Sequence, residues 1–299
     1  LVARAVTFAM TTVTLVTLGL IIVFIFVESV AAFRYESVTV FGVSVPGLGM
    51  FVQTRWDAVS DPVRYSLLPM IHGTAMVTAI ATLVAAPLGV AAALFISEIA
   101  PPVVREVVKP GIEILAGIPS IVYGFIGFTI INPWAGEEFA LNGGSTYLFV
   151  GIVVGLMALP TVVSVAEDAL TSVPDSMKDG SLALGATEWQ SMTSMSLPAA
   201  FSGVSAAVLL GVGRAIGETM AATVMLAGVQ KIPEPITNVF YGYETLTSLI
   251  AANYGNASGV QESALFAAGV VLFVTVLCLS VASQYIEARM RRRLGGERT

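Results

Sequence analysis

Six long apolar stretches with few charges constrain this chain more than any other feature. A helix needs about 20 apolar residues to cross the ~30 Å hydrocarbon core of a bilayer, and each stretch reaches that length. The stretches cover approximately residues 6–27, 69–97, 112–131, 147–166, 198–228 and 263–286. Only 11% of all residues are charged, which is less than half of the roughly 25% found in soluble domains. The sequence therefore predicts an all-α integral membrane protein with six transmembrane helices in one bundle.

The first stretch could be read as a secretory signal because it closely follows Arg4. Its apolar run exceeds the roughly 7–15 residues of a signal h-region, so we expect a retained helix. Residues 1–68 then form an N-terminal transmembrane helix and an extracytoplasmic loop. Residues 69–287 form the main transmembrane domain, and residues 288–299 form a basic cytoplasmic tail.

The distribution of basic residues predicts which side of the membrane each loop faces. Six spans place both termini on one side, and positive charges gather in cytoplasmic loops. With the termini inside, the cytosolic segments hold most of the basic residues: Arg4, Arg105, Lys109, Lys178, Arg289, Arg291, Arg292, Arg293 and Arg298. The other side holds only Arg34, Arg55, Arg64 and Lys231. We therefore expect a multi-pass protein of the cell membrane whose termini and 167–197 loop are cytoplasmic.

Several classes of function are excluded by what the sequence lacks. It contains no G-x-x-x-x-G-K-[ST] loop, no HExxH and no GxSxG, so we expect no nucleotide-binding site and no enzymatic activity in this chain. The single cysteine, Cys278, and the single histidine, His72, cannot supply a disulfide or a Cys-rich metal site. We expect no metal and no cofactor. A net charge of −6 without a basic face disfavours nucleic acid as a partner.

Two charges interrupt the fifth apolar stretch. Arg214 and Glu218 are four positions apart, and a charge near the centre of a membrane helix costs about 2.5–3.5 kcal/mol. On a continuous helix the two side chains share one face and can pair. The pair is either a structural ion pair or part of a transport path, since intramembrane charges mark such paths. Because an arginine fork suits an oxyanion such as phosphate, we expect Arg214 to meet an anion in transit and Glu218 to hold the guanidinium otherwise.

The polar loop between the fourth and fifth stretches has the pattern of two short helices joined at an elbow. A helix is expected through residues 177–184, begun near Pro174 and ended by Gly185 in a left-handed conformation. Thr187 and Gln190 have the spacing of a capping box, which predicts a second helix. The apolar side chains on this polar loop are Leu182, Leu184 and Trp189. Such an elbow either meets a partner or is an ordinary surface loop.

Three prolines lie inside the predicted spans. Pro87, Pro119 and Pro160 each delete a helical hydrogen bond and favour a kink. The segment Ala116-Gly-Ile-Pro-Ser120, which is followed by Gly124 and Gly127, is the strongest candidate for a bend or a close helix contact.

Motifs in the elbow and in two spans resemble those of a known family. Asp179-Gly-Ser-x-x-x-Gly185, nine further residues and Met195-x-Leu-Pro198 resemble the EAA motif of type I ABC importer permeases, E-A-A-x-x-x-G-x9-I-x-L-P. The spacing agrees throughout, although Asp replaces Glu, Gly-Ser replaces Ala-Ala and Met replaces Ile. Leu115-Ala-Gly-Ile-Pro-Ser-Ile-Val-Tyr-Gly124 and Gly213-Arg-Ala-Ile-Gly-Glu-Thr-Met-Ala221 look like signatures of phosphate ABC transporter permeases of the PstC type.

The resemblance implies a fold, a function and partners. The fold would be the six-helix, MetI-like bundle of a type I ABC importer permease, and the function would be ATP-driven import of inorganic phosphate into the cytoplasm. Its cytoplasmic coupling helix would be formed by Asp179, Gly180, Ser181, Leu182, Leu184 and Gly185. The implied partners are a PstA-like permease subunit, PstB-like ATPase subunits that hydrolyse ATP, and an extracytoplasmic phosphate-binding protein, all at the lipid bilayer. Arg214 and Glu218 would belong to the translocation path.

Three alternatives remain open on the sequence. A related permease for another oxyanion, such as molybdate, tungstate or sulfate, would share the elbow but not the stretch of residues 213–221. A self-sufficient secondary transporter or channel would use the charged pair as a proton or ion site and would work without an ATPase. A purely structural membrane scaffold would have no need of charges inside a span.

Overall fold

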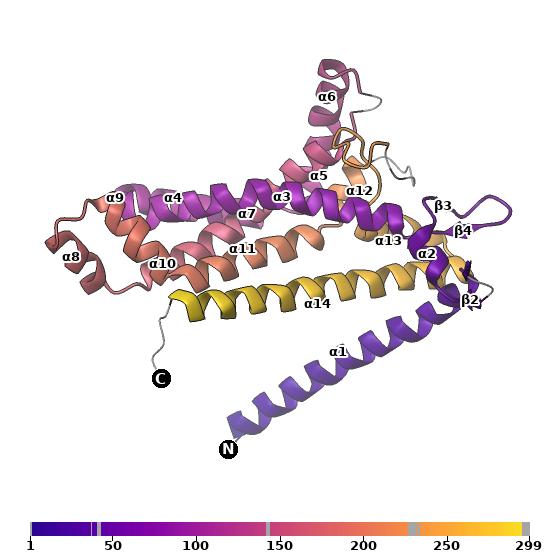
Figure 1. The fold of residues 1–299 in the computed structure, drawn as a ribbon, viewed down its shortest axis with the longest axis horizontal. Coiled ribbons are helices and arrows are strands. Elements are labelled where there is room, and N and C mark those ends of the chain that lie inside the picture. Colours follow the sequence, from indigo (N-terminus) through magenta and orange to yellow (C-terminus); the bar gives the residue numbers. More distant parts are fainter. Residues whose placement is uncertain are drawn as a thin grey trace.

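The long helices of the molecule lie side by side along a common direction (Figure 1). This computed structural model describes residues 2–36, 38–40, 43–141, 144–226, 232 and 234–294. Within these ranges four helices are long and apolar enough to cross a bilayer: Ala3–Tyr35, Leu68–Ile99, Tyr147–Thr171 and Val260–Ala282. Two further segments are bent pairs, Pro102–Gly117 with Ser120–Glu138 at 85° and Glu188–Ala199 with Phe201–Ile216 at 72°. The described chain therefore has four continuous spans, or six if each bent pair crosses as one.

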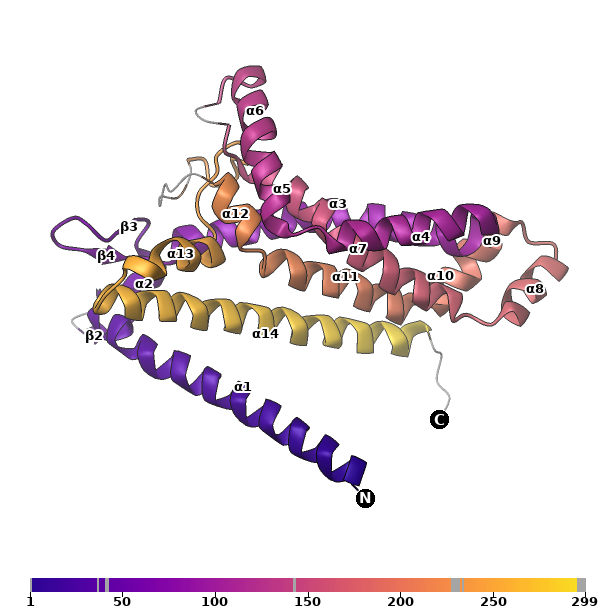
Figure 2. The same ribbon diagram turned by 180° about the vertical axis from the view of Figure 1, so that it is seen from behind.

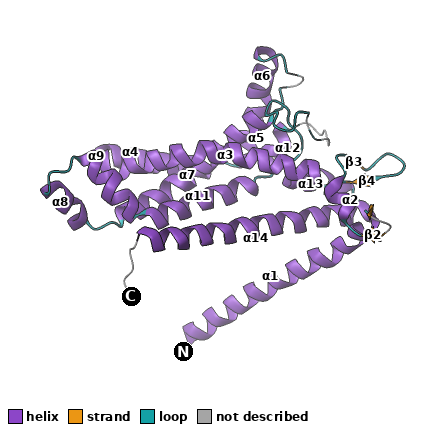
Figure 3. Ribbon diagram, viewed as in Figure 1, coloured by secondary structure: helices purple, strands orange, loops and turns teal. Residues whose placement is uncertain are grey.

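Helices make up nearly all of the regular structure (Figure 3). In chain order they are α1 (Val2–Tyr35), α2 (Leu48–Val52), α3 (Leu68–Leu94), α4 (Pro102–Gly117), α5 (Ser120–Ile126), α6 (Asn132–Glu138), α7 (Tyr147–Thr171), α8 (Asp175–Ala183), α9 (Glu188–Ser191), α10 (Leu197–Ala199), α11 (Phe201–Ile216), α12 (Met220–Met225), α13 (Leu246–Asn253) and α14 (Val260–Leu294). Short π-helical segments extend some of these helices: η1 (Phe95–Ile99), η2 (Gly127–Ile131) and η3 (Met192–Ser196), and a 3₁₀ turn, η4 (Tyr254–Asn256), follows α13. Within the described ranges, β1 (Val38–Val40) pairs antiparallel with β2 (Val43–Val45), and β3 (Trp56–Asp57) with β4 (Arg64–Tyr65).

The centre of the bundle is the contact between α3 and α7, where small residues let two backbones come close. A Cβ atom on Gly155 of α7 would meet the backbone oxygen of Ala81 in α3 at 2.9 Å, and one on Gly89 would meet Val162 at 2.7 Å. α11 packs on the same pair of helices, and neighbouring side chains such as Val150 are fully buried. This core anchors the elbow, because α8 follows α7 after three residues.

The helix α1 packs against α14 near its C-terminal end and diverges from it toward its N-terminus (Figures 1 and 2). The rings of Phe24 and Phe266 meet edge to face with centroids 5.5 Å apart. Farther toward the N-terminus, Phe8 and Leu15 are 75% and 64% exposed. The N-terminal end of α1 and the C-terminal end of α14 point toward the end of the bundle that carries α8 (Figure 1). This arrangement agrees with an even number of spans.

The third predicted span is bent, and the bend lies where the sequence predicts it. α4 ends at Gly117, Ile118 adopts an extended conformation in front of Pro119, and α5 begins at Ser120. Proline disfavours a helical conformation in the residue before it, which accounts for the 85° change of direction. The other two prolines inside predicted spans, Pro87 and Pro160, lie within continuous helices.

The predicted close helix contact is also present. A Cβ atom on Gly124 of α5 would meet the Cα atom of Ala221 in α12 at 2.8 Å. The neighbouring Gly127 lies against the side chain of Met225. Glycine at position 124 therefore allows α5 and α12 to pack backbone to backbone, and Gly127 of η2 leaves room for the Met225 side chain.

The fifth predicted span is broken, so the prediction of one continuous helix through residues 198–228 is wrong. α11 begins at Phe201 and ends at Ile216, and α12 begins at Met220; residues 227 and 228 lie outside the described residues. The short α12 is fixed at its C-terminal end, where side chains of Asn132 and Ser145 donate to the carbonyl oxygen of Met225 at 2.8 and 2.7 Å. Tertiary hydrogen bonds thus replace the helical continuation that the apolar sequence suggests.

A buried carboxylate holds together the end of the molecule opposite α8. Glu36 is 5% exposed and accepts hydrogen bonds from the backbone N–H of Tyr65 at 2.6 Å and from Nε2 of Gln53 at 3.2 Å. These bonds join the C-terminal end of α1 to β4 and to the segment after α2. The buried charge is therefore satisfied by donors from two other elements.

The β3–β4 hairpin at that same end carries an exposed tip. The carboxylate of Asp57 accepts hydrogen bonds from the backbone N–H groups of Ser60 and Val59 at 3.0 and 3.2 Å. These two bonds, with that from Ser60 the stronger influence, hold the pKa of Asp57 below its usual value. Val59 at the tip is 95% exposed.

Candidate functional site

The predicted elbow is formed by α8 and α9. α8 spans Asp175–Ala183 and directly follows Pro174. Both of its ends lie within two residues of the predicted ends, 177 and 184. Gly185 has φ of +88°, and its N–H donates to Leu182 O at 2.9 Å while the N–H of Ala186 donates to Ser181 O at 3.1 Å. This pair of bonds is the Schellman motif that ends a helix at a left-handed residue. The prediction for the C-terminal end of α8 is confirmed.

The second helix of the elbow begins with the predicted capping box. The Thr187 hydroxyl accepts from the N–H of Gln190 at 3.2 Å, and the Gln190 side chain accepts from the N–H of Thr187 at 2.9 Å. α9 then continues through η3 and α10 toward the bend before α11. Both turns of the elbow are therefore fixed by local sequence.

Apolar side chains of the elbow lie on the surface. Leu184 is 92% exposed, Trp189 66% and Leu182 41%. Polar and small residues accompany them, and a Cβ atom on Gly180 would meet nothing within 4 Å. No residue of the described chain covers Leu184, so the elbow offers an apolar contact surface.

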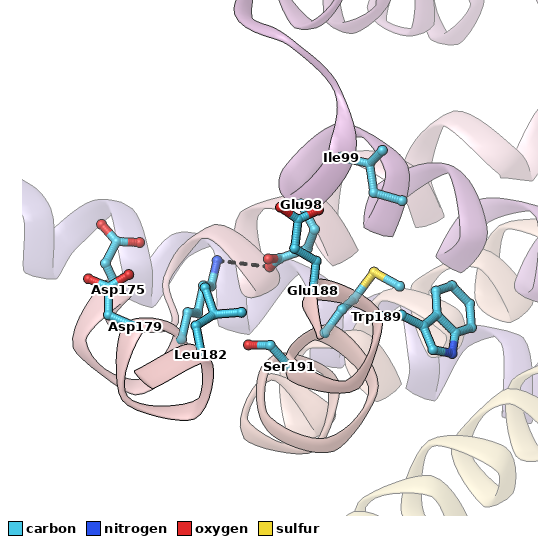
Figure 4. A pocket seen from close by; sticks show the side chains of 10 residues that line it. Glu98, Ile99, Asp175, Asp179, Leu182, Glu188, Trp189 and Ser191 are labelled. Carbon is cyan, nitrogen blue, oxygen red and sulfur yellow. Dashed lines mark ion pairs between the residues drawn. The ribbon is translucent and has the colours of Figure 1, made fainter. Parts of the chain in front are cut away.

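A cavity of about 570 Å³ opens between α8, α9 and the end of α3 (Figure 4). Carboxylates from three elements line it: Glu98 from η1, Asp175 and Asp179 from α8, and Glu188 from α9. Figure 4 shows Asp175 and Asp179 together on one side of the cavity and Trp189 on the other. The predicted coupling residue Asp179 thus faces a predominantly acidic hollow.

One lysine forms an ion pair with one of these carboxylates. Nζ of Lys178 lies 2.8 Å from Oε1 of Glu98, and the two side chains are 18% and 12% exposed. The Oγ atoms of Ser181 and Ser191 lie 2.6 Å apart and join α8 to the end of α9. The elbow is therefore attached to η1 and to its own second helix by side chains.

Arg214 and Glu218 do not form the predicted ion pair; no ion pair between them occurs in the described part of the chain. The reason is the break after α11, which places Glu218 outside the helix that carries Arg214. The Glu218 carboxylate instead accepts from the N–H of Ala221 at 3.1 Å, at the start of α12. Its backbone oxygen accepts from the Thr247 hydroxyl at 2.8 Å. Glu218 therefore fixes the break rather than the guanidinium.

The exposed Arg214 lies in an apolar groove between α11 and α14. The groove measures about 760 Å³, and its lining is mostly apolar, with Ser280 and Gln284 as polar neighbours from α14. A guanidinium on such a surface has donors free for an anion or for another chain. The structure thus separates the two predicted path residues: Glu218 is partly buried in the break, and Arg214 faces outward.

Sequence reasoning missed the contribution of Glu98 and Lys178 to the elbow. Glu98 is the first charge after the second apolar stretch, and Lys178 is one of only three lysines. These were the available signals, but neither shows that the two side chains meet. Their partnership depends on how α8 folds back toward the end of α3, which no local pattern encodes.

Comparison with known proteins matches most of the chain to one family and to named relatives. The model of the family described as "Binding-protein-dependent transport system inner membrane component" matches residues 85–292. The chain is 38% identical over 239 residues to "Probable ABC transporter permease protein YqgH" of Bacillus subtilis, covering 79% of this chain and 76% of the relative. It is 31% identical over 280 residues to "Phosphate transport system permease protein PstC" of Haemophilus influenzae, covering 87% and 86%.

Two solved structures share the fold at low sequence identity. A bacterial alginate ABC transporter, in complex with an alginate pentasaccharide-bound periplasmic protein, matches with a TM-score of 0.64 at 16% identity, over 97% of this chain and 94% of that chain. The MetNI methionine ABC transporter matches with a TM-score of 0.55 at 18% identity, over 75% and 97%. These likenesses confirm the predicted bundle and carry no information about the substrate.

Proposed function

The chain belongs to the family of binding-protein-dependent transport system inner membrane components, and we propose that it is the PstC-type permease subunit of an ATP-driven phosphate importer. It is an ABC transporter permease subunit of the cell membrane. Several of its relatives are named as phosphate transport permeases, which supports phosphate as the transported ion. The observation that carries the proposal is that one chain combines an exposed apolar elbow with an exposed arginine inside an apolar spanning segment.

The elbow is the surface to which an ATPase binds. An exposed leucine on a short, capped helix presents a rigid apolar contact to a partner, and the acidic cavity beside it attracts basic side chains. We assign ATP hydrolysis to this partner, a PstB-like subunit. The residues that dock are Asp179, Gly180, Ser181, Leu182, Leu184 and Gly185.

Arg214 is the residue that meets phosphate in transit. Its guanidinium can donate two charge-assisted hydrogen bonds to one oxyanion, and the low dielectric of a membrane bundle strengthens such bonds. The companion chain that completes the path over the groove of α11 and α14 is a PstA-like permease. Glu218 keeps the adjacent break in shape by capping α12, so that the path backbone is preorganised.

We infer the remaining partners from the orientation of the chain in the membrane. We assign both termini and the elbow to the cytoplasm, and this is supported by the basic residues at that end and by the common direction of the N-terminal end of α1 and the C-terminal end of α14. The β3–β4 end then faces the outside, where a phosphate-binding protein delivers its ligand. Lipid surrounds the exposed apolar faces.

The experiment that tests this function is reconstitution of the chain with a PstA-like permease, a PstB-like ATPase and a phosphate-binding protein in liposomes. We expect uptake of radioactive phosphate that requires ATP inside the vesicles, with molybdate, tungstate and sulfate taken up at background rates. ATP-driven uptake of one of those ions in place of phosphate would refute the substrate assignment. Uptake by this chain alone, without the ATPase, would refute the importer assignment and favour a secondary transporter.

A further inference from the structure

At the elbow end, the polar contacts form a closed ring of elements. The ring begins with Lys178 of α8, which meets Glu98 of η1 at 2.8 Å. η1 continues α3 directly. Since α3 and α7 form the centre of the bundle, a side chain that joins α8 to η1 connects the elbow to the core by a route other than the main chain.

The second contact joins η1 to α4. The Arg105 guanidinium donates from Nε to Ile96 O at 2.9 Å and from Nη2 to Ser97 O at 2.7 Å. Carbonyl groups at the end of a helix lack partners within it, and the cation satisfies two of them. Because α4 has no buried residues, its position depends strongly on such side-chain contacts.

The third contact joins α4 back to α7. Nζ of Lys109 lies 2.6 Å from a carboxylate oxygen of Glu167 and 3.5 Å from one of Asp168. The Glu167 side chain is 6% exposed, so this charge is held inside the molecule. A buried charge that loses its partner destabilises a protein, so separating Lys109 from Glu167 is costly in free energy.

The ring closes through the main chain, because residues 172–174 connect α7 to α8. Its order is α8, η1, α4, α7 and again α8. α4 leads into the 85° bend before α5, and α5 packs backbone to backbone on α12 next to the broken segment that Glu218 caps. A displacement of α8 can therefore reach both the core and the break through contiguous contacts.

We propose that the Lys178–Glu98 ion pair is the link that transmits movement of the elbow to α3, with Arg105 and Lys109 carrying it on to α4 and α7. This inference rests on the proposed function, since it assumes that an ATPase moves α8. Lys178 and Glu98 are positioning residues, which touch neither ATP nor phosphate. The three other carboxylates that line the cavity belong to α8 and α9, so none of them can replace Glu98 as a connection to α3.

The test uses the complete four-component complex in liposomes with inorganic phosphate. The variants are Glu98→Gln, Lys178→Met and the exchanged double variant E98K/K178E. The quantities measured are phosphate imported per ATP hydrolysed, ATP hydrolysis stimulated by the loaded binding protein, and recovery of the assembled complex. The matched control is Glu106→Gln, which neutralises an exposed carboxylate of α4 that takes part in none of the ion pairs of the described residues.

We expect each single variant to assemble and to hydrolyse ATP while its phosphate import per ATP falls by about fivefold or more, the lower range of coupling between sites. The exchanged double variant should recover part of that loss, and the control should keep the wild-type ratio. Single variants with a wild-type ratio would overturn the proposal. A wild-type complex without ATP-driven import would overturn the proposed function itself, which is a separate result.

A cross-link gives a second measurement that does not depend on removing a charge. Cysteines replace Glu98 and Lys178 in a Cys278→Ser background, and a short bismaleimide joins them. If the two side chains move together, the cross-linked complex imports phosphate with a higher ratio per ATP than the same complex before cross-linking. Loss of import on cross-linking would show that α8 and η1 must separate, and would overturn the proposal.

Discussion

Gly180 and Gly185 lie in the same elbow, but only Gly185 has a backbone conformation that favours glycine. Gly180 sits inside α8, where an added Cβ would meet nothing within 4 Å. Gly185 also has open space around it, but its φ of +88° is a left-handed conformation that other residues adopt at a cost. One glycine therefore weakens the helix, whereas the other ends it.

The two glycines give opposite expected results for the same substitution. Gly180→Ala should stabilise α8 by about 1 kcal/mol because alanine has the higher helix propensity. Gly185→Ala should destabilise the elbow by about 1–2 kcal/mol because of the left-handed backbone. Hydrogen exchange of the α8 amides measures both effects. Slower exchange in Gly185→Ala than in Gly180→Ala would contradict this account of the elbow.

Arg214 is a further position at which a single substitution is expected to have a large effect, here on phosphate import. Arg214→Ala should lower ATP-driven phosphate import about tenfold or more, since hydrogen bonds to charged groups contribute about 1.5–3 kcal/mol. Import by Arg214→Lys should lie between that of the wild type and that of Arg214→Ala, because lysine keeps the positive charge but lacks the forked guanidinium. Leu83→Met, on a 74% exposed position of α3, serves as the control. Wild-type import by Arg214→Ala would refute the role of the arginine.

At the scale of elements, the contact between α5 and α12 is set by backbone proximity rather than by side-chain chemistry. Gly124 lies where a Cβ atom would be 2.8 Å from the Cα atom of Ala221. Backbone atoms cannot move aside as the end of a flexible side chain can. The position of α12, and with it the capped break at Glu218, therefore depends on this glycine.

A larger side chain at Gly124 should separate the two helices. Gly124→Val is expected to destabilise the protein by about 1–3 kcal/mol, the usual range for overpacking, and to reduce import as well. Gly117→Ala, with nothing within 4 Å of the added Cβ, should change stability by less than about 0.5 kcal/mol. Thermal unfolding in detergent compares the two variants. Equal unfolding temperatures for both would contradict the close contact.

Local patterns predicted some elements of this molecule and not others. The C-terminal end of α8 at Gly185, the capping box at Thr187 and the bend at Pro119 were each predictable, because each depends on residues adjacent in sequence. The break after Ile216 was not, because apolar residues continue on both sides of Gly217-Glu-Thr219. It is held by distant residues such as Thr247. For the same reason the pairing of Arg214 with Glu218 was wrong, and their place in a translocation path stays a prediction.

At the scale of the whole molecule, the elbow and the β3–β4 hairpin lie at opposite ends of the helical bundle (Figure 1). In the orientation that we propose from the positive-inside rule, the elbow lies in the cytoplasm. Each end carries an almost fully exposed apolar side chain, Leu184 in the elbow at 92% and Val59 in the hairpin at 95%. These two positions can report the orientation of the chain.

Cysteine labelling measures that orientation. In a Cys278→Ser background, Val59→Cys should react with a membrane-impermeant maleimide in intact cells, and Leu184→Cys should react only after the membrane is opened. The permease is expressed without its ATPase, so that both cysteines are exposed and the two variants are controls for each other. The reverse pattern would place the elbow outside and would exclude its docking to a cytosolic ATPase.

If an ATPase drives this permease through the elbow, disruption of the elbow surface should abolish import by the reconstituted four-component complex. Leu184→Asp leaves the fold intact because the side chain is 92% exposed, but it places a charge in the apolar contact. We predict that ATP-driven phosphate import falls to background and that the ATPase no longer co-purifies with the permease. Normal import together with normal ATPase binding in Leu184→Asp would contradict the account.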